Sequence, residues 1–373
     1  MLKPGFVWQK KIKFGLKDKM NFTIPKLMHA VLLTSHGGME KMEYRSDVEV
    51  PVPKEDEVLI NVKGAGINNT DINTRTGWYS KSSVENADDG SWSGNPLNFP
   101  IIQGADICGN IVAVGSSVDN KRIGERVIVR TMQTVPENQK TFSAWTVGSE
   151  CNGGFAQYAS IRSSEAFLIN SNWTDADIAS IPCAYSTAEG LLHRSQVGEE
   201  KVFITGASGG VGSAAIQLAK LRGATVIAQC ASEKKDEIKK IGADQIVFRE
   251  SNLIEEIGKN SVDVVIDLVA GSNWKQLLDI LKPGGRYATS GAIAGPIVEL
   301  DVRTLYLKDL TLYGCTHQPK EVFTNLIGYI ERNEIRPLVS KTYPLQDIKK
   351  AQEEFLSKKL TGKLVLIPPN DNV

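Results

Sequence analysis

Apolar and polar positions alternate in two different ways along this chain of 373 residues. From about residue 185 to residue 319, short apolar runs alternate with longer stretches that have helical spacing. This pattern predicts βαβ units, in which a parallel sheet is covered by helices on both faces. The predicted strands are Val202–Thr205, Thr225–Gln229, Gln245–Val247, Val262–Leu268 and Gly285–Ser290, and the predicted helices are Gly210–Leu221, Glu233–Ile241 and Asn273–Leu281.

Residues 26–184 have a different texture, with short strand-like segments bounded by Gly, Pro, Asn and Asp and no long run of helical periodicity. This texture predicts a small, irregular, barrel-like β domain. The predicted strands are Met28–Thr34, Glu57–Val62, Gly109–Val114 and Arg126–Arg130. Ser80–Pro100 is rich in Ser, Asn, Asp and Gly, and we expect it to form a long surface loop that shapes a substrate pocket.

The two ends of the chain follow neither pattern. The C-terminal fifty residues predict two helices, Lys320–Arg332 and Leu345–Leu356, and a strand, Lys363–Ile367, that the pattern alone assigns to no sheet. Residues 1–27 contain seven lysines and one aspartate, without the apolar segment of a signal peptide or the Arg and Ser of a transit peptide. We interpret them as a basic N-terminal extension, either solvated or held on a neighbouring surface.

Composition excludes several classes of partner. Forty-three basic and forty-three acidic residues cancel, so no overall field favours nucleic acid or an anionic membrane. No apolar run reaches the roughly 18 residues that a membrane span needs. The five cysteines are scattered without a C-x-x-C pair, which indicates reduced thiols and a cytoplasmic location.

The segment Thr205–Gly212 carries the clearest chemistry in the chain. It follows a buried strand and opens a helix, and this arrangement cradles the pyrophosphate of a dinucleotide on backbone N–H groups at the helix N-terminus. Gly209 allows the backbone to approach the phosphates, and Gly212 allows the helix to pack closely on the strand. The predicted cofactor-binding residues of this turn are Ala207, Ser208, Gly209, Gly210 and Val211.

Further motifs resemble those of the medium-chain dehydrogenases and reductases from about residue 28 to the end. They are Gly66-Ile67-Asn68-Asn69-Thr70-Asp71, Gly104-Ala105-Asp106-Ile107-Cys108-Gly109, Gly153-Gly154-Phe155-Ala156-Gln157-Tyr158 and Thr361-Gly362-Lys363-Leu364-Val365. The resemblance implies an α/β fold made of a GroES-like β-rich catalytic domain and a doubly wound Rossmann domain with a parallel sheet. We expect the catalytic domain over 28–184, the NADP-binding domain over 185–319, and a return to the catalytic domain over 320–373.

The resemblance breaks at the metal site. Zinc-dependent members of the family place zinc ligands at positions that hold Asn68, Ala105 and Cys183 in this chain, and the segment Thr131–Gly148 lacks the cysteines of a structural zinc lobe. Zinc prefers a tetrahedral set of thiolates and imidazoles, which these residues do not supply. We therefore predict no metal and a likeness to the zinc-free quinone oxidoreductase (zeta-crystallin-like) branch. A remodelled site built on Asp106 and Cys183 is the alternative.

The end of the second strand of the Rossmann pattern bears on cofactor choice. An NAD-preferring site places a carboxylate there to bind the ribose 2′-hydroxyl, and none occurs before Glu233. Ser232 and Lys234 are suited instead to a 2′-phosphate, which predicts NADP as the cofactor. The alternative is that Lys234 and Lys235 are a solvated helix start.

The resemblance also implies where the nicotinamide ring and the acceptor lie. Thr187 and the backbone of Gly291, Ala292 and Ile293 are expected to contact the nicotinamide. The expected catalytic residues are Asn68, Thr70 and Tyr79, with Tyr79 as proton donor. Each has a structural alternative: Asn68 and Thr70 close a turn, and Tyr79 and Trp78 fill the core.

These observations predict an NADPH-dependent, zinc-independent oxidoreductase that transfers hydride to a quinone or an α,β-unsaturated carbonyl, because a conjugated acceptor delocalises the incoming electrons itself and needs less help from a Lewis acid. Two alternatives remain: a zinc-type alcohol dehydrogenase with altered ligands, and an NADPH-binding structural or regulatory protein with little turnover. The partner is a small-molecule substrate whose identity the sequence does not reveal. An edge strand predicted over Leu310–Tyr313 favours a homodimer.

Overall fold

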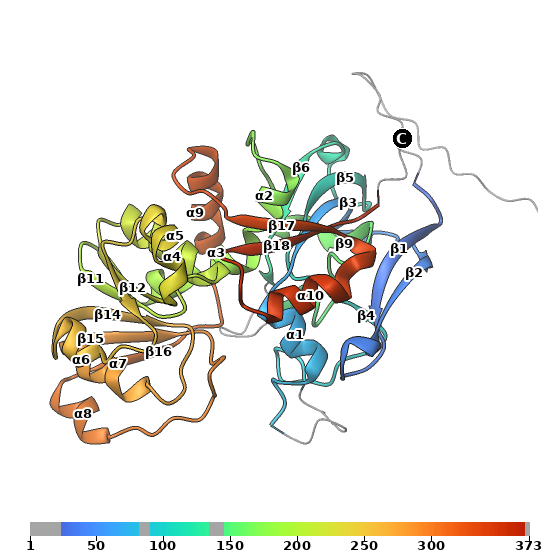
Figure 1. Ribbon diagram of the computed structural model, residues 1–373. Helices are drawn as coiled ribbons and strands as arrows, with labels where there is room; N and C mark the ends of the chain where they lie inside the picture. Colours follow the sequence, from blue (N-terminus) through green and yellow to red (C-terminus); the bar gives the residue numbers. More distant parts are fainter. Residues whose placement is uncertain (1–23, 82–89, 134–144, 370–373) are drawn as a thin grey trace, which may run out of the picture.

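The computed structural model describes residues 24–81, 90–133 and 145–369. Residues 1–23 of the basic N-terminal extension, residues 82–89 of the predicted Ser80–Pro100 loop and residues 134–144 of the segment Thr131–Gly148 therefore lie outside the described residues. The described chain forms two parts, a helix-covered parallel sheet and a β-rich part, which are joined by the helix α3 (Pro182–Arg194) (Figure 1). No helix within the three described ranges is long and apolar enough to cross a membrane.

The first part is built on a six-stranded sheet in which every neighbouring pair is parallel, in the order β13-β12-β11-β14-β15-β16. Its strands are β11 (Lys201–Ile204), β12 (Thr225–Cys230), β13 (Gln245–Phe248), β14 (Val262–Asp267), β15 (Leu281–Thr289) and β16 (Thr311–Gly314). The five strands predicted from the alternating pattern are all present, and the α/β fold class is confirmed.

Alternate residues of these strands enter two separate hydrophobic cores. On β11, Val202 and Ile204 face the core with α3 and α4, whereas Phe203 faces the core with α6 and α7. Successive side chains of a strand point to opposite faces, so burial on both faces explains the continuous apolar runs in the sequence. The helices of this part are α4 (Gly210–Leu221), α5 (Lys235–Ile241), α6 (Leu253–Ile257), α7 (Trp274–Ile280) and α8 (Val302–Leu307).

The second part contains three sheets, with strand orders β2-β1-β4, β10-β6-β5-β3-β18-β17 with β9 on β3, and β7-β8. The strands are β1 (Leu27–Leu33), β2 (Met42–Glu49), β3 (Glu57–Gly66), β4 (Ile101–Ile102), β5 (Cys108–Val114), β6 (Arg126–Val129), β7 (Met132–Gln133), β8 (Trp145–Thr146), β9 (Tyr158–Arg162), β10 (Ala166–Leu168), β17 (Val339–Pro344) and β18 (Lys363–Ile367). The helices are α1 (Asn69–Thr76), α2 (Asp175–Ala179) and α10 (Ile348–Leu356). A further helix, α9 (Lys320–Glu331), packs against α3 in the core that α3 and α4 share.

The C-terminal strand β18 joins a sheet that begins far away in the sequence. It pairs antiparallel with β3, with Val365 opposite Gly66. This pairing brings Lys363, at the start of β18, next to the residues that follow β3. The domain boundaries expected at residues 184 and 319 stay predictions. The helix α3 runs without a break across residue 184, so the end of an element does not mark the first boundary.

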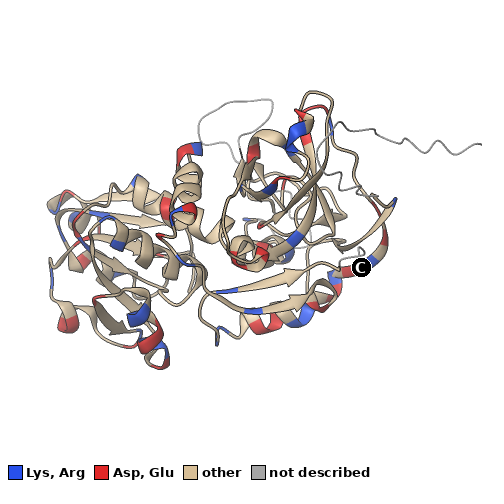
Figure 2. Cartoon of the chain, turned by 90° about the horizontal axis from the view of Figure 1, so that it is seen from above, with Lys and Arg blue, Asp and Glu red and all other residues tan. Residues whose placement is uncertain are grey.

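Local differences from the predictions are few. The edge strand predicted over Leu310–Tyr313 is the strand β16, Thr311–Gly314, and it follows the helix α8, Val302–Leu307, which the pattern did not predict. The helix predicted from Glu233 begins at Lys235, after a 3₁₀ turn at Ser232–Lys234. Acidic and basic residues are interspersed over both parts (Figure 2), in agreement with the balanced composition.

Candidate active site

The glycine turn between β11 and α4 has the geometry of an anion cradle. Gly206 adopts a positive φ of 58° that favours glycine, and Gly209 is extended just before α4 begins. A Cβ on Gly212 would lie 2.3 Å from the Gly206 carbonyl oxygen, so the close packing of helix on turn depends on glycine at this position. The α4 N-terminus therefore presents free N–H groups, and these residues fit a dinucleotide pyrophosphate.

The other predicted residues of this turn differ in their surroundings. Ala207 is fully buried, and its N–H donates to the Gln229 carbonyl oxygen over 3.1 Å. The Ser208 carbonyl oxygen accepts a hydrogen bond of 3.0 Å from the N–H of Gly362, which precedes β18. Gly210 and Val211 are the first residues of α4. The turn is thus attached by its backbone to the C-terminal strand of the β-rich part.

The two residues predicted to bind a 2′-phosphate, Ser232 and Lys234, have protein partners in the structure. Lys234 Nζ donates to the carbonyl oxygens of Lys358 and Leu360, each over 2.9 Å, and burial lowers the pKa of this lysine. Ser232 follows β12 as predicted, and its hydroxyl lies 3.4 Å from a Glu233 carboxylate oxygen. The Lys234 ammonium therefore holds the segment before β18 in place with two of its three N–H donors.

Arg249 is a cation at the same end of the sheet that the sequence analysis missed. It directly follows β13, and its N–H donates to the Cys230 carbonyl oxygen at the end of β12. Its charge lowers the pKa of Lys234, so the two cations lie close together. Only the parallel pairing of β12 with β13 brings a residue that is 17 positions beyond Ser232 to this place.

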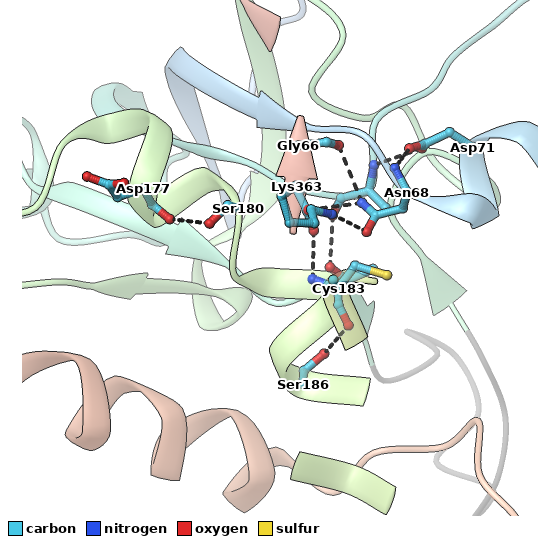
Figure 3. Close-up of polar contacts among 12 residues, drawn as sticks. Gly66, Asn68, Asp71, Asp177, Ser180, Cys183, Ser186 and Lys363 are labelled. Carbon is cyan, nitrogen blue, oxygen red and sulfur yellow. Dashed lines mark hydrogen bonds and ion pairs between the residues drawn. The ribbon is translucent and has the colours of Figure 1, made fainter. Parts of the chain in front are cut away.

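Four residues form a buried polar network at the position of the zinc site of the zinc-dependent members (Figure 3). Lys363 Nζ lies 3.0 Å from an Asp106 carboxylate oxygen and donates to Asn68 Oδ1. Asn68 Nδ2 donates to the same Asp106 oxygen over 2.9 Å. The other Asp106 oxygen accepts from the backbone N–H of Cys183 over 2.6 Å. Asp106 is fully buried and Lys363 is 3 % exposed.

This network does not fit zinc. Lys363 brings an ammonium group against the Asn68 and Asp106 oxygens, and Ala105 has no donor atom. Burial raises the pKa of the Cys183 thiol, with the Asp106 charge adding to the effect, so this thiol resists the deprotonation that metal binding requires. No group of three or more His, Cys, Asp or Glu side chains within residues 24–81, 90–133 and 145–369 is arranged to hold a metal ion.

Asn68 is more constrained than the sequence predicts. Its side-chain nitrogen faces the Asp106 carboxylate and, over 3.4 Å, the Gly66 carbonyl oxygen, while its side-chain oxygen accepts from Lys363. Its backbone N–H donates to an Asp71 carboxylate oxygen over 2.7 Å, directly before α1. The amide must give up one of these partners before it binds an acceptor oxygen, which favours a role in positioning.

Burial raises the pKa of Asp71 to about 7, and hydrogen bonds from the Asn68 and Ala105 N–H groups only partly oppose this. The nearby Asp106 charge also raises this pKa, and Lys363 lowers it. Among the described residues, the donors to the Asp71 carboxylate are the backbone N–H groups of Asn68 and Ala105, so its contacts support a structural role.

Tyr79 lies beside this network in an aromatic cluster. Burial raises its pKa, and hydrogen bonds with Thr70 and Asn73 oppose that shift. Its ring stacks on Trp92 with a centroid distance of 5.8 Å and meets Trp78 edge-on at 5.6 Å. Trp92 belongs to the predicted Ser80–Pro100 loop, and the sequence analysis did not single it out. A hydroxyl that stays protonated at neutral pH is suited to proton donation.

Two of the four predicted nicotinamide contacts, Gly291 and Ala292, line a cavity of about 450 Å³ together with Trp78. Thr187 and Ile293 are not among its lining residues, and Ile293 is 59 % exposed. Thr187, on α3, forms a hydrogen bond with the Cys183 side chain. Asn68, Thr70 and Tyr79 are not among the lining residues. The cavity and the buried network thus meet at the aromatic cluster, where Trp78 lies against Tyr79.

Comparison with known proteins matches both parts of the chain to the dehydrogenase family that its motifs resemble. Residues 54–171 match the family model of the alcohol dehydrogenase GroES-like domain, and residues 210–332 match that of the zinc-binding dehydrogenases. The quinone oxidoreductase of Sus scrofa is 32 % identical over 92 % of this chain and 98 % of its own length. The NADPH-dependent alkenal/one oxidoreductase of Arabidopsis thaliana chloroplasts is 29 % identical over 93 % of this chain and 81 % of its own length.

A solved structure from Sinorhizobium meliloti, described as a candidate alcohol dehydrogenase, is 44 % identical with a TM-score of 0.87, and the match covers 93 % of this chain and 98 % of that one. A GroES-like domain joined to a dinucleotide-binding sheet defines an oxidoreductase that uses a nicotinamide cofactor. The chain belongs to the medium-chain dehydrogenase/reductase superfamily, in its quinone oxidoreductase branch.

Proposed function

We propose that this protein is an NADPH-dependent, zinc-independent reductase of quinones or α,β-unsaturated carbonyls. The observation that carries the proposal is the Lys363–Asp106–Asn68 network, which occupies the metal position beside an intact glycine turn. The names of the relatives, quinone oxidoreductase and alkenal/one oxidoreductase, agree with it.

The choice of acceptor follows from the poor fit of the Lys363–Asp106–Asn68 network to zinc, which acts as the Lewis acid in zinc-dependent dehydrogenases. A simple ketone needs a metal or a strong hydrogen-bond donor to polarise its carbonyl group. A quinone or an enone delocalises the incoming electron pair onto its own oxygen. Bound NADPH supplies the hydride. In this proposal the α4 N-terminus holds the pyrophosphate, Thr187, Gly291, Ala292 and Ile293 orient the nicotinamide, and the Tyr79 hydroxyl gives a proton to the reduced acceptor.

The preference for NADPH over NADH rests on the end of β12. No carboxylate is available there for a ribose 2′-hydroxyl before Glu233, and Ser232, Lys234 and Arg249 gather near this strand end. In the proposal, Lys234 turns from its two carbonyl partners to the phosphate.

The proposal also includes a homodimer and a cytoplasmic location. The strand β16 is the last of its sheet and carries a partner on one side only. A second copy that adds its own β16 would cover this edge through a two-fold axis. All five cysteines are unpaired, which supports a reducing compartment.

The test is a panel of quinones, enones, aldehydes and ketones, with NADPH oxidation followed for the purified protein before and after chelation. We expect turnover of quinones or enones, little turnover of simple ketones, no effect of the chelator, and less than 0.1 zinc per chain by mass spectrometry. Stoichiometric zinc with activity lost on chelation would instead indicate the altered zinc dehydrogenase. Tight NADPH binding without turnover of any acceptor would indicate the binding protein.

A further inference from the structure

The segment 358–363, which leads from the end of α10 into β18, is held at its start by Lys234. Lys234 Nζ donates to the carbonyl oxygens of Lys358 and Leu360, each over 2.9 Å. These oxygens are neutral acceptors, whereas the phosphate that Lys234 is proposed to bind is an anion. A charged acceptor makes the stronger hydrogen bond with an ammonium group. The 2′-phosphate of NADPH therefore competes with this segment for Lys234, and NADH, which lacks that phosphate, does not.

The hold of Lys234 on the segment is partly offset by a like charge. Burial lowers the pKa of Lys358, and the charge of Lys234 lowers it further, so the two ammonium groups lie near each other. Like charges repel. Lys234 therefore binds the backbone of a residue whose side chain it repels, and this arrangement is easier to exchange for a phosphate.

The same segment contacts the two residues at the start of α1. Lys358 Nζ donates to the side-chain oxygen of Asn69, the first residue of α1, over 3.1 Å. Lys363 Nζ donates to the side-chain oxygen of Asn68, the residue before it (Figure 3). Two lysines of one short segment thus connect the place of Lys234 to the buried network.

Between these two lysines the segment lies against the glycine turn. The Gly362 N–H donates to the Ser208 carbonyl oxygen over 3.0 Å, and Gly362 pairs with Gly209 in an isolated parallel bridge. A Cβ on Gly210 would lie 2.7 Å from Cδ of Lys363, so the stem of this lysine packs on the first residue of α4. A movement of the segment along the turn therefore reaches the Lys363 side chain.

We propose that this segment makes turnover depend on the 2′-phosphate of the cofactor, with Lys234 and Lys358 as positioning residues. The inference rests on the proposed function and deepens it, because it states at which step NADPH is preferred. In the held state, Lys234 binds the segment and Lys363 binds Asn68. When Lys234 turns to the phosphate, the segment is released and Lys363 loosens its hydrogen bond. The Asn68 side chain is then able to turn its N–H donors towards an acceptor oxygen.

Two states of the segment give the proposal a definite sign. A ligand shifts an equilibrium between two states only through its different affinity for them. NADPH favours the released state because its phosphate needs Lys234, whereas NADH binds both states equally. By linkage, a variant that weakens the held state binds the 2′-phosphate more tightly. The same variant reaches the released state without the phosphate, so its kcat with NADH rises.

Binding is tested with two fragments that lack the nicotinamide, 2′-phospho-ADP-ribose and ADP-ribose. They are titrated by calorimetry into the wild-type protein, Asn69→Ala, Asn69→Asp and the control Asn120→Ala, an exposed asparagine in the β-rich part. Asn69→Ala removes the contact with Lys358, so we expect it to bind 2′-phospho-ADP-ribose at least twofold more tightly than the wild type. Asn69→Asp turns that contact into an ion pair and should bind it at least twofold more weakly. The Kd of ADP-ribose should change by less than 1.5-fold throughout.

Hydrogen–deuterium exchange followed by mass spectrometry measures the release itself. In the wild type, we expect the backbone amides of residues 358–361 to exchange at least threefold faster with saturating 2′-phospho-ADP-ribose than with saturating ADP-ribose. Equal or slower exchange would show that Lys234 binds the phosphate and the segment together, and it would overturn the inference.

Turnover of one enone at saturating cofactor gives the third measurement. We expect the wild type to have a kcat with NADPH at least tenfold above that with NADH. Asn69→Ala and Lys234→Met should each raise the kcat with NADH at least threefold, which the loss of a purely structural contact would not do, and Asn120→Ala should leave it unchanged. Equal kcat values with the two cofactors in the wild type would overturn the inference.

The outcomes separate this inference from the proposed function. If the wild type prefers 2′-phospho-ADP-ribose and both Asn69 variants keep the same preference, the coupling is wrong and the proposed function stands. If no acceptor is reduced but the fragment affinities and the exchange respond as expected, the proposed function fails and the coupling through the 358–363 segment stands.

Discussion

At the scale of single residues, the partners of Lys363 are the most informative contacts in the candidate site. Lys363 neutralises the Asp106 carboxylate and donates a hydrogen bond to the side-chain oxygen of Asn68. The side-chain nitrogen of Asn68 donates to Asp106, so Asn68 and Asp106 have their polar partners within this network. A carboxylate that is fully buried needs such a partner, because burial of an unpaired charge is costly.

A charge-matched pair of variants tests this network. Lys363→Met leaves the Asp106 carboxylate buried without its cation, and we expect a loss of about 3–5 kcal/mol in the free energy of unfolding. The double variant Asp106→Asn with Lys363→Met removes both charges and should recover most of that loss. Urea denaturation followed by circular dichroism measures both. A single variant as stable as the wild type would show that the pair is not needed to hold the fold.

The raised pKa of Asp71 predicts a dependence of stability on pH. The folded protein holds the Asp71 proton up to about pH 7, whereas the unfolded chain releases it near pH 4, so this group stabilises the fold in acid and loses that contribution as the pH rises to about 7. Asp71→Asn removes the titration. As the pH rises from 4 to 8, we expect the free energy of unfolding of the variant to increase by a few kcal/mol relative to that of the wild type, as measured by urea denaturation. A constant difference across this range would contradict the shift.

Tyr79 is the residue whose removal separates proton transfer from binding. Tyr79→Phe keeps the stack on Trp92 and removes the hydroxyl that contacts Thr70 and Asn73. We expect kcat with an enone to fall about 100-fold, at the lower end of the effects of general acids, while the Kd of NADPH stays unchanged. The matched control is Tyr306→Phe on α8, an exposed tyrosine that should have wild-type kinetics. An unchanged kcat in Tyr79→Phe would assign the proton to another donor.

At the scale of elements, the start of β18 joins the two parts of the molecule. Its Gly362 bonds to the glycine turn, its Lys363 bonds to the residues that follow β3, and Lys234 holds the segment just before it. Three contacts within one short stretch therefore connect the glycine turn to the Asn68–Asp106 network. A shift of this stretch on cofactor binding would also move Lys363 and so change its hydrogen bond to Asn68.

Lys234→Met tests the proposed exchange of partners. We expect the Kd of NADPH to rise at least tenfold, because a charge-assisted hydrogen bond to the 2′-phosphate is lost, while the Kd of NADH changes by less than threefold. Cofactor fluorescence titrations measure both. Lys320→Met provides a control, because Lys320 is a surface lysine at the start of α9. If NADPH and NADH lose affinity equally, Lys234 acts only by holding the 358–360 segment.

At the scale of the whole molecule, an uncovered sheet edge lies next to exposed apolar residues. The segment before β16 exposes several large apolar side chains, namely Ile293, Ile297, Val302, Tyr306 and Leu307. Such residues rarely gather at the free surface of a monomer, and an edge strand invites pairing with another chain.

We therefore expect the protein in solution to have twice the mass of one chain by multi-angle light scattering. The substitution Leu307→Glu introduces a charge at this surface and should lower the measured mass towards that of a monomer. The control Val52→Glu introduces the same charge at an exposed site in the β-rich part and should leave the mass unchanged. A wild-type monomer at 50 µM would contradict the dimer.

The agreement between sequence and structure is best where a local pattern is enough. The helix Gly210–Leu221 was predicted to the residue, because an apolar stripe and a glycine turn mark its course and its start. Lys234 shows the opposite case: its place in the sequence favoured a phosphate contact, but its partners are carbonyl oxygens more than 120 residues away. Arg249 and Trp92 were missed because nothing near them in the sequence marks the residues that they approach.

The sequence by itself determined the class of fold and the glycine turn between β11 and α4, and it predicted the absence of a zinc-ligand set, because each depends on spacing and residue type within a short stretch. Only the tertiary structure decided what replaces the metal, since Lys363 lies 257 positions from Asp106. It likewise decided that Arg194 and His317 share a cavity with Trp78. Pairing of distant strands sets these contacts, and no local pattern encodes which distant side chains will meet.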